Sequence, residues 1–234
     1  MSSPSPHPTS PPPSAGAPAS AAITRAWQHK GWLACSLLPV SWLYRGLVAL
    51  RRGLYQRQLL RAYRAPVPVV VVGNVTAGGA GKTPVTIHLV QALRALGWQP
   101  GVVSRGYGRD TGLAPSPDAA VLVQPDSPPA LVGDEPLLMA RSAQVPVAVA
   151  RRRADAVRAL LAAHPDTNLI ISDDGLQHLA LARDVDIAVF NRFGVGNGWL
   201  LPAGPLREPW PRPVDIAVYA DAPPPQLAAT GASS

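Results

Sequence analysis

The stretch VPVVVVGNVTAGGAGKTP, residues 67–84, decides the fold of this chain. It opens with a run of β-branched valines, as expected of a strand that is covered on both faces of a sheet. A glycine-rich loop follows, and the apolar periodicity of residues 84–96 predicts a helix directly behind it. A strand, a glycine loop and a helix in this order form the frame of a phosphate-binding loop.

The loop between this strand and helix has the residue types that phosphate binding requires. Glycines let successive backbone N–H groups point at phosphate oxygens, a lysine reaches the β- and γ-phosphates, and a threonine hydroxyl binds Mg²⁺. The strict pattern has glycine where this chain has Thr76, but further glycines in the loop offset this departure. We expect a nucleotide to bind at Thr76, Ala77, Gly78, Gly79, Ala80, Gly81, Lys82 and Thr83.

Around this unit, apolar strand candidates alternate with helical patterns. The strand candidates are residues 101–104, 120–123, 146–150, 168–172, 186–190 and 215–219, and the helical patterns are residues 135–142 and 154–163. This alternation predicts an α/β domain with a P-loop NTPase-like, doubly wound, mostly parallel sheet. We place this core at residues 66–220. The Pro/Ser/Ala tract 1–22 and the tail 221–234 are expected to be disordered.

Two acidic pairs are candidates for chemistry. Asp173 and Asp174 end the apolar run NLIIS, where a parallel sheet would bring them to the same crevice as the glycine loop. The alternative for this pair is a solvated turn. Asp134 and Glu135 stand at the start of a predicted helix, where acids commonly serve as caps. In a kinase, such a carboxylate can instead accept the proton of the acceptor hydroxyl.

Two arginine-containing segments could bind an anion. The segment SRGYGR, residues 104–109, offers two arginines and a tyrosine between glycines, which suits an anionic or sugar-bearing ligand but also a solvated loop. The run Arg151, Arg152 and Arg153 could bind a phosphate or could be the solvated start of a helix. The sequence leaves both alternatives open.

The positive charge of the chain is unevenly distributed. The net charge is +7, but residues 1–109 hold 12 Arg and Lys with no acidic residue, and residues 110–234 hold 9 basic against 14 acidic residues. Such asymmetry suggests nucleic acid, an anionic membrane surface or a phosphorylated ligand as partner. Because no base-stacking or groove-reading module is found, nucleic acid is not expected. The single cysteine, Cys35, excludes a disulfide framework and a cysteine-based zinc site.

The segment 31–50, GWLACSLLPVSWLYRGLVAL, is apolar apart from Arg45, is interrupted by Pro39 and is followed by five arginines up to residue 64. This pattern predicts a membrane-associated apolar and basic helical segment over residues 23–65. It could be an amphipathic anchor or one short span with its C-terminal side in the cytoplasm. A buried helix packed on the following domain is the alternative.

The blocks LLPVSWLY, GNVTAGGAGKTP, SRGYGR, VGDEP, DDGLQH and LLPAGPLREP follow one another in an order and spacing that resemble the tetraacyldisaccharide 4′-kinase family, the lipid A 4′-kinases of Gram-negative bacteria. The resemblance extends from about Trp32 to Pro209. It implies Mg²⁺-assisted transfer of the γ-phosphoryl group of ATP to the 4′-hydroxyl of a tetraacylated disaccharide 1-phosphate. The partners it implies are this lipid A precursor and an anionic membrane surface, at the cytoplasmic face of the inner membrane, without an obligate protein partner.

The resemblance also implies roles for single residues. Asp134 would be the general base, and Lys82 and His178 would be further catalytic residues. The metal-related residues would be Thr83, Glu135, Asp173 and Asp174, and the substrate side would hold Arg105, Tyr107 and Gln177.

One departure from the family concerns the C-terminal part. The family continues past the LREP block into a region with its own glycine motif and a histidine-bearing motif, whereas this chain has no histidine after His178. We therefore expect this chain to lack part of a second lobe. Two alternatives stay open. The chain could be another P-loop NTPase, such as a metal-chaperone or partner-switching GTPase, or a fragment that binds nucleotide without turnover.

Overall fold

The computed structural model describes residues 27–78, 81–114, 116 and 118–219. The predicted disordered leader and tail, and Gly79 and Ala80 of the predicted loop, lie outside the described residues. Seven strands form one sheet in the order β3-β4-β2-β5-β1-β6-β7. Their bounds are β1 (Val69–Gly73), β2 (Pro100–Ser104), β3 (Val121–Val123), β4 (Val147–Val149), β5 (Leu169–Asp173), β6 (Val185–Phe190) and β7 (Ile216–Tyr219).

The sheet is parallel at every pairing except that of β3 with β4, which is antiparallel. Strand β1 lies between β5 and β6, and β1, β2 and β5 are almost wholly buried. Their valine- and isoleucine-rich sequences fit this position, because both faces of a parallel sheet are covered. The predicted α/β class with a mostly parallel sheet is confirmed.

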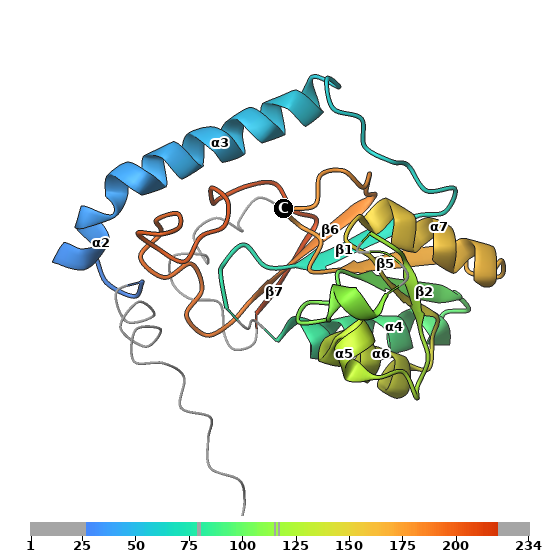
Figure 1. Ribbon diagram of the computed structural model, residues 1–234. Coiled ribbons are helices and arrows are strands. Elements are labelled where there is room, and N and C mark those ends of the chain that lie inside the picture. Colours follow the sequence, from blue (N-terminus) through green and yellow to red (C-terminus); the bar gives the residue numbers. More distant parts are fainter. Residues whose placement is uncertain (1–26, 79–80, 115, 117, 220–234) are drawn as a thin grey trace, which may run out of the picture.

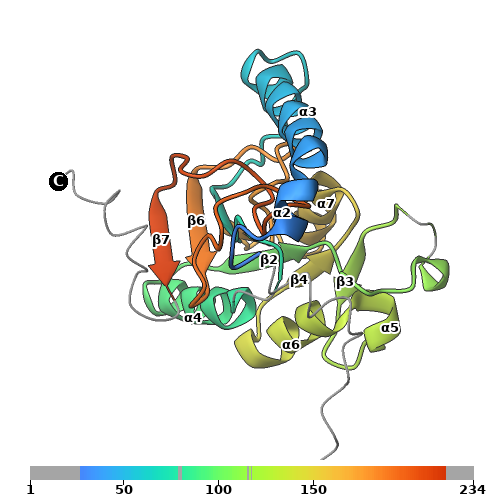
Figure 2. The same cartoon turned by 90° about the vertical axis from the view of Figure 1, so that its left-hand side faces the viewer.

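Helices cover both faces of the sheet (Figures 1 and 2). On one face lie α4 (Lys82–Ala95), α5 (Pro129–Val132) and α6 (Asp134–Ala143), and on the other lies α7 (Arg153–Ala163). A short 3₁₀ helix, η1 (Thr111–Leu113), precedes β3. Each layer has its own apolar core, one around Val90 and Ile171 and the other around Leu160 and Phe190. Burial on both faces thus holds the strands that carry the candidate site.

The carboxyl ends of β1 and β5 meet at one edge of the sheet. Val72, near the end of β1, is in register with Asp173, the last residue of β5. The backbone N–H of Gly175 donates to the carbonyl oxygen of Val72 at 3.2 Å, which holds the turn after β5 against β1. The glycine loop after β1 and the acidic pair after β5 therefore share one edge, as expected for a ligand site in an open parallel sheet.

Two N-terminal helices, α2 (Trp32–Ser36) and α3 (Leu38–Gln56), lie outside the sheet layers (Figure 1). Pro39 is the second residue of α3, in the first turn, where its missing N–H costs no hydrogen bond, so it does not interrupt this helix. The Ser41 hydroxyl donates to the carbonyl oxygen of Leu200 at 2.8 Å, and the Tyr44 hydroxyl donates to that of Arg207 at 2.7 Å. One side of α3 is thereby fixed to the segment 200–207.

The predicted helical segment 23–65 is helical only in part, because α3 ends at Gln56. The chain then runs without a helix to a bridge between Tyr63 and Leu181, ahead of β1. Among the helices that the structure describes, none combines the length and the apolar character needed to cross a membrane.

Candidate functional site

The phosphate-loop candidate starts where β1 ends. Asn74 is buried; its Nδ2 donates to the carbonyl oxygen of Gly78 at 3.2 Å, and its Oδ1 accepts from Lys82 Nζ at 3.4 Å. The N–H of Ala77 donates to the carbonyl oxygen of Pro205 at 2.7 Å. Gly81 takes a left-handed conformation, φ 69°, directly before α4. The described part of the loop is therefore held in shape by contacts at both ends, and Asn74 is a contributor that the sequence analysis missed.

Asp173 is the buried member of the acidic pair, with 1% of its surface exposed. Its Oδ1 accepts a hydrogen bond from Thr86 Oγ1, on α4, at 3.1 Å. Burial, together with the nearby carboxylates of Asp174 and Glu135, raises the pKa of Asp173 to about 6. A buried carboxylate among other carboxylates favours a bound cation, because a cation would offset their repulsion.

Asp174 lies in a left-handed turn, φ 48°, and its side chain faces Lys82, the first residue of α4. Its Oδ1 lies 3.4 Å from Lys82 Nζ and 3.1 Å from Arg207 Nη1. The structure thus brings the predicted phosphate-loop lysine and the predicted acidic pair together, although they are about 90 residues apart in sequence.

The acidic pair fits a Mg²⁺ site that is completed by a nucleotide. Within the described residues there is no cluster of three or more His, Cys, Asp or Glu side chains that could hold a metal alone. Mg²⁺ in phosphate-transfer sites is usually held by one or two carboxylates, a hydroxyl and the substrate phosphates. Thr83, in the first turn of α4, and Asp173 supply donors of this kind.

A cleft of about 910 Å³ opens beside the acidic pair. Arginines dominate its walls. They come from α3 and the chain after it, from the loop after β2, from α7 and the residues just before it, and from position 207. The predicted site residues that line it are Arg105, Tyr107, Glu135, Asp173, Asp174, Gln177 and His178. Asp134, Lys82 and Thr83 are not among its lining residues, so the cleft lies beside the phosphate loop and does not enclose it.

Close backbone packing fixes the loop 104–109 against the start of α6. Gly106 and Gly133 both have positive φ, 69° and 90°. A Cβ on Gly133 would lie 2.9 Å from the carbonyl oxygen of Tyr107, so only glycine fits there. Tyr107, 89% exposed, thus lies beside the N-terminus of α6, whose first residue is the exposed Asp134. Arg105 and Tyr107 line the cleft, and their role toward a ligand stays a prediction.

The start of α7 contributes a buried arginine. Arg153 is 2% exposed, and its Nη2 donates to the carbonyl oxygen of Asp173 at 2.8 Å. Its Nε and Nη1 have no hydrogen-bond partner among the described residues. Burial lowers the pKa of Arg153 to about 10, which leaves the guanidinium charged at neutral pH. Arg151 and Arg152 are exposed, so only the third arginine of the run is a buried residue of the site.

His178 packs against this arginine. Its Nε2 accepts from the backbone N–H of Arg153 at 3.4 Å. Burial, followed by the charge of Arg153, lowers the pKa of His178 to about 4, so the imidazole is neutral at physiological pH.

Two further residues of the site come from the segment 200–208. Arg207 Nη1 donates to both carboxylate oxygens of Asp174, at 3.1 and 3.2 Å. Glu208 is buried, and its Oε1 accepts from Gln177 Nε2 at 2.7 Å. Neither residue was a predicted site residue; the only signal in the sequence was their place in the block LLPAGPLREP, where a charged pair interrupts apolar and proline residues.

Comparisons with known proteins agree with this geometry. The sequence model of the LpxK family, described as tetraacyldisaccharide-1-P 4'-kinase, matches residues 33–232. The tetraacyldisaccharide 4'-kinase of Acidovorax sp. (strain JS42) is 64% identical over 199 residues, which are 85% of this chain and 57% of the relative. That of Delftia acidovorans is 56% identical over 228 residues, which are 93% and 66% of the two chains.

One solved structure is also similar. It is the crystal structure of the "apo" form of LpxK from Aquifex aeolicus in complex with ATP, with a TM-score of 0.67 and 34% identity, and the match covers 76% of this chain and 55% of that one. The chain thus spans between about half and two thirds of the length of these relatives. Because the family match extends over most of the chain, this chain belongs to the tetraacyldisaccharide-1-P 4'-kinase family.

Proposed function

We propose that this chain transfers the γ-phosphoryl group of ATP to the 4′-hydroxyl of a tetraacylated disaccharide 1-phosphate, a precursor of lipid A. One observation carries the proposal. Lys82 of the phosphate loop faces Asp174 across 3.4 Å at the margin of an arginine-lined cleft. Such a site can hold a triphosphate on one side and an anionic acceptor on the other.

On the nucleotide side, the loop Thr76–Thr83 would bind the phosphates with its backbone N–H groups. Lys82, now paired with Asp174 and Asn74, would turn to the β- and γ-phosphates and stabilise the charge of the transferring group. Mg²⁺, when bound, would neutralise phosphate oxygens and bring them into line with the acceptor. Thr83 and Asp173 would hold it, with Asp174 and Glu135 close by.

On the acceptor side, Asp134 would accept the proton of the 4′-hydroxyl. The hydroxyl oxygen then forms a bond to the γ-phosphorus while the bond to the departing ADP breaks. The exposed carboxylate of Asp134, at the N-terminus of α6, is free to meet a bound sugar, with Tyr107 beside it. Arg51, Arg61 and Arg105 give the cleft the positive charge that a phosphorylated acceptor needs.

We further propose that α3 lies on the anionic cytoplasmic surface of the inner membrane. Its outward side exposes large apolar residues, among them Trp42 and Leu43, each 67% exposed, and Leu47, 58% exposed. Its inward side uses the polar groups of Ser41 and Tyr44 to contact the domain. This is the reverse of the usual surface helix, which points its apolar stripe at the core, and it suits a helix whose solvent is lipid.

The test of the kinase proposal is transfer of radiolabel from [γ-³²P]ATP to purified tetraacyldisaccharide 1-phosphate in mixed micelles. The intact chain should transfer label, and the variant Asp134→Ala should lose nearly all transfer while still binding ATP. If Asp134→Ala transfers at the rate of the intact chain, the general-base role is wrong. If the intact chain binds ATP without any transfer, it is a nucleotide-binding fragment and the kinase proposal fails for this chain.

The membrane proposal is tested by sedimentation with vesicles of phosphatidylglycerol and phosphatidylethanolamine. The chain should sediment with these vesicles, and the double variant Trp42→Ser, Leu47→Ser should stay in the supernatant with its unfolding temperature unchanged. Replacement of the exposed Leu96 by serine, directly after α4, is the matched control and should leave sedimentation unchanged. A chain that stays in the supernatant at low salt contradicts the proposal.

A further inference from the structure

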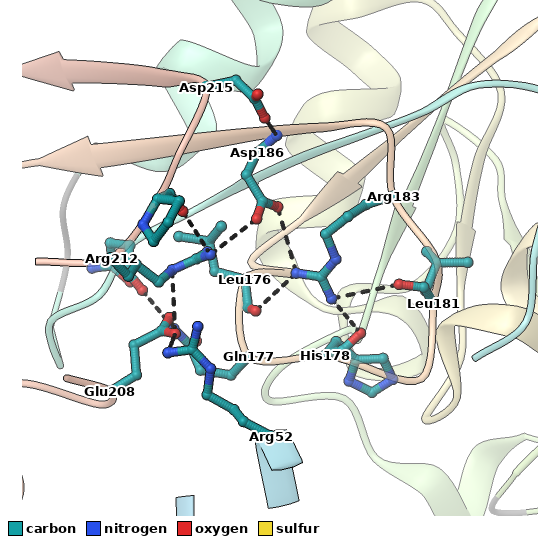
Figure 3. A network of polar contacts seen from close by, with 12 residues as sticks. Arg52, Leu176, Gln177, His178, Leu181, Arg183, Asp186, Glu208, Arg212 and Asp215 are labelled. Atoms are coloured by element: carbon teal, nitrogen blue, oxygen red, sulfur yellow. Dashed lines mark hydrogen bonds and ion pairs between the residues drawn. The ribbon is translucent and has the colours of Figure 1, made fainter. Parts of the chain in front are cut away.

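Behind the candidate site, a connected set of charged side chains is largely buried (Figure 3). Its central residue is Glu208, whose side chain is 7% exposed. Oε2 of Glu208 lies 3.3 Å from Arg212 Nε and 3.9 Å from Arg52 Nη1, which comes from α3. Oε1 of the same carboxylate accepts the hydrogen bond from Gln177. One carboxylate therefore connects α3, the segment after Glu208 and the loop after β5.

The contact with Glu208 fixes which way the Gln177 amide points. Both donor hydrogens of its Nε2 are used, one toward Glu208 Oε1 at 2.7 Å and one toward the carbonyl oxygen of Asn74 at 3.0 Å. The amide oxygen must then face Arg207 Nη1, at 3.5 Å, which also holds Asp174. A flipped amide would place its oxygen against the Glu208 carboxylate, so the orientation is set as long as Glu208 stays in place.

Arg212 holds Glu208 in place from behind. While its Nε lies beside Glu208, its Nη1 donates to Asp186 Oδ2 at 3.0 Å, and Asp186 directly precedes the buried part of β6. A guanidinium can face two carboxylates at once because its nitrogens form a rigid fork, which a lysine ammonium cannot copy. Arg212 side-chain exposure is 10%, so solvent cannot replace either contact.

A second arginine fixes the other end of the same loop. Arg183 donates to the carbonyl oxygens of Leu176, at 2.9 Å, and His178, at 2.8 Å, and pairs with Asp186 Oδ1 at 3.5 Å. Asp186 thus lies between Arg183 and Arg212, as Figure 3 shows. Asp186 of β6 therefore holds both arginines, of which Arg183 fixes the backbone of the loop after β5 and Arg212 holds Glu208, the carboxylate that orients Gln177.

We propose that Arg212 is a positioning residue of the site, which acts through Glu208 to fix the Gln177 amide and, through Arg207, the carboxylate of Asp174. Arg212 itself does not line the cleft. For its effect on turnover, this inference rests on the proposed kinase function. Its effect on the Gln177 amide does not depend on turnover and can be measured separately.

The first test observes the Gln177 side chain by ¹⁵N-edited NMR on the full chain in micelles, with the signal assigned by its loss in Gln177→Glu. In Arg212→Lys, which keeps the buried positive charge, the Gln177 NH₂ signals should move to the shifts of exposed glutamines, as they should in Glu208→Gln. The control Arg141→Lys alters an exposed arginine at the far end of α6 and should leave the signals unchanged. Unchanged Gln177 signals in Arg212→Lys would overturn the proposal.

The second test is a double-mutant cycle on the transfer rate. Arg212→Lys should lower kcat roughly tenfold. In the background of Glu208→Gln, the same change should lower kcat by no more than about twofold, because both substitutions remove the contact between Arg212 and Glu208. If the two effects multiply in full, Arg212 does not act through Glu208 and the proposal is wrong. If the unmodified chain transfers no phosphate, the kinase proposal fails, and the NMR result alone decides the role of Arg212.

Discussion

Replacing Asp173 by asparagine should stabilise the domain at neutral and alkaline pH. Asparagine keeps an oxygen to accept the hydrogen bond from Thr86 and removes a charge that is 1% exposed and near two other carboxylates. The pKa of Asp173 is raised from 3.8 to about 6 in the folded chain. A raised carboxyl pKa means that the folded state holds its proton more tightly, so stability is lost as pH rises from about 4 through 6.

The size of this effect follows from the shift. A difference of about two pKa units at 1.4 kcal/mol each amounts to about 3 kcal/mol above pH 6. For a domain of this size, that corresponds to an unfolding temperature higher by about 6–12 °C in the variant. Near pH 4 the two proteins should unfold at similar temperatures, because Asp173 is then protonated in the folded state.

The assay is thermal unfolding followed by circular dichroism at pH 4 to 8, in EDTA so that no cation offsets the buried charge. Asp173→Asn should unfold at a higher temperature than the parent chain at pH 8 and should be inactive in phosphate transfer. A variant that is equally or less stable than the parent at pH 8, or a difference that does not change with pH, would refute the reasoning from burial and carboxylate repulsion.

Three further predictions follow from the site. Lys82→Ala should lower the transfer rate at saturating ATP by roughly a hundredfold, measured with labelled ATP, because Lys82 would supply positive charge to the transferring group. Gly133→Ala should lower the free energy of unfolding, measured by denaturant titration, by about 1–3 kcal/mol, because φ is 90° at this position and the new Cβ would meet the Tyr107 carbonyl oxygen. The control Gly46→Ala, in α3 where the space around the glycine is open, should raise the free energy of unfolding slightly. The His178 imidazole should titrate near pH 4 by NMR, and Arg153→Met should shift its midpoint upward because a neighbouring positive charge is lost; an unchanged midpoint would contradict the pairing.

Much of the site could be predicted from the chain because its chemistry is local. The loop before Lys82 directly follows the buried strand β1, and Asp173 and Asp174 lie at the end of the buried strand β5; parallel strands bring such ends to one edge. Helix and strand bounds agreed with the apolar periodicity to within a few residues. The prediction for the N-terminal segment was less complete, because Pro39 lies in the first turn of α3 and the helix ends before the last three arginines.

Other parts of the site depend on contacts between distant segments. Thr86 follows Thr83 by three residues, but only the packing of α4 on β5 brings its hydroxyl to Asp173. Arg207 lies 33 residues from Asp174 in sequence, and the return of the segment 200–208 to the edge of the sheet is a tertiary feature. No periodicity or spacing in the sequence predicts these two contacts, because they form only when α4 and the segment 200–208 pack against the folded sheet.

The sequence by itself determined the α/β fold, the phosphate loop and the acidic pair. Runs of β-branched residues, glycines and the Gly-Lys-Thr at the end of the loop determine local backbone conformation, which neighbouring residues are enough to set. Only the tertiary structure decided which charges are buried. Arginines on the surface and in the site look alike in a sequence, yet Arg153 and Arg212 are enclosed while Arg151 and Arg152 face solvent. Desolvation and partner charges, which set the pKa values and orientations of the site, exist only once the segments have packed together.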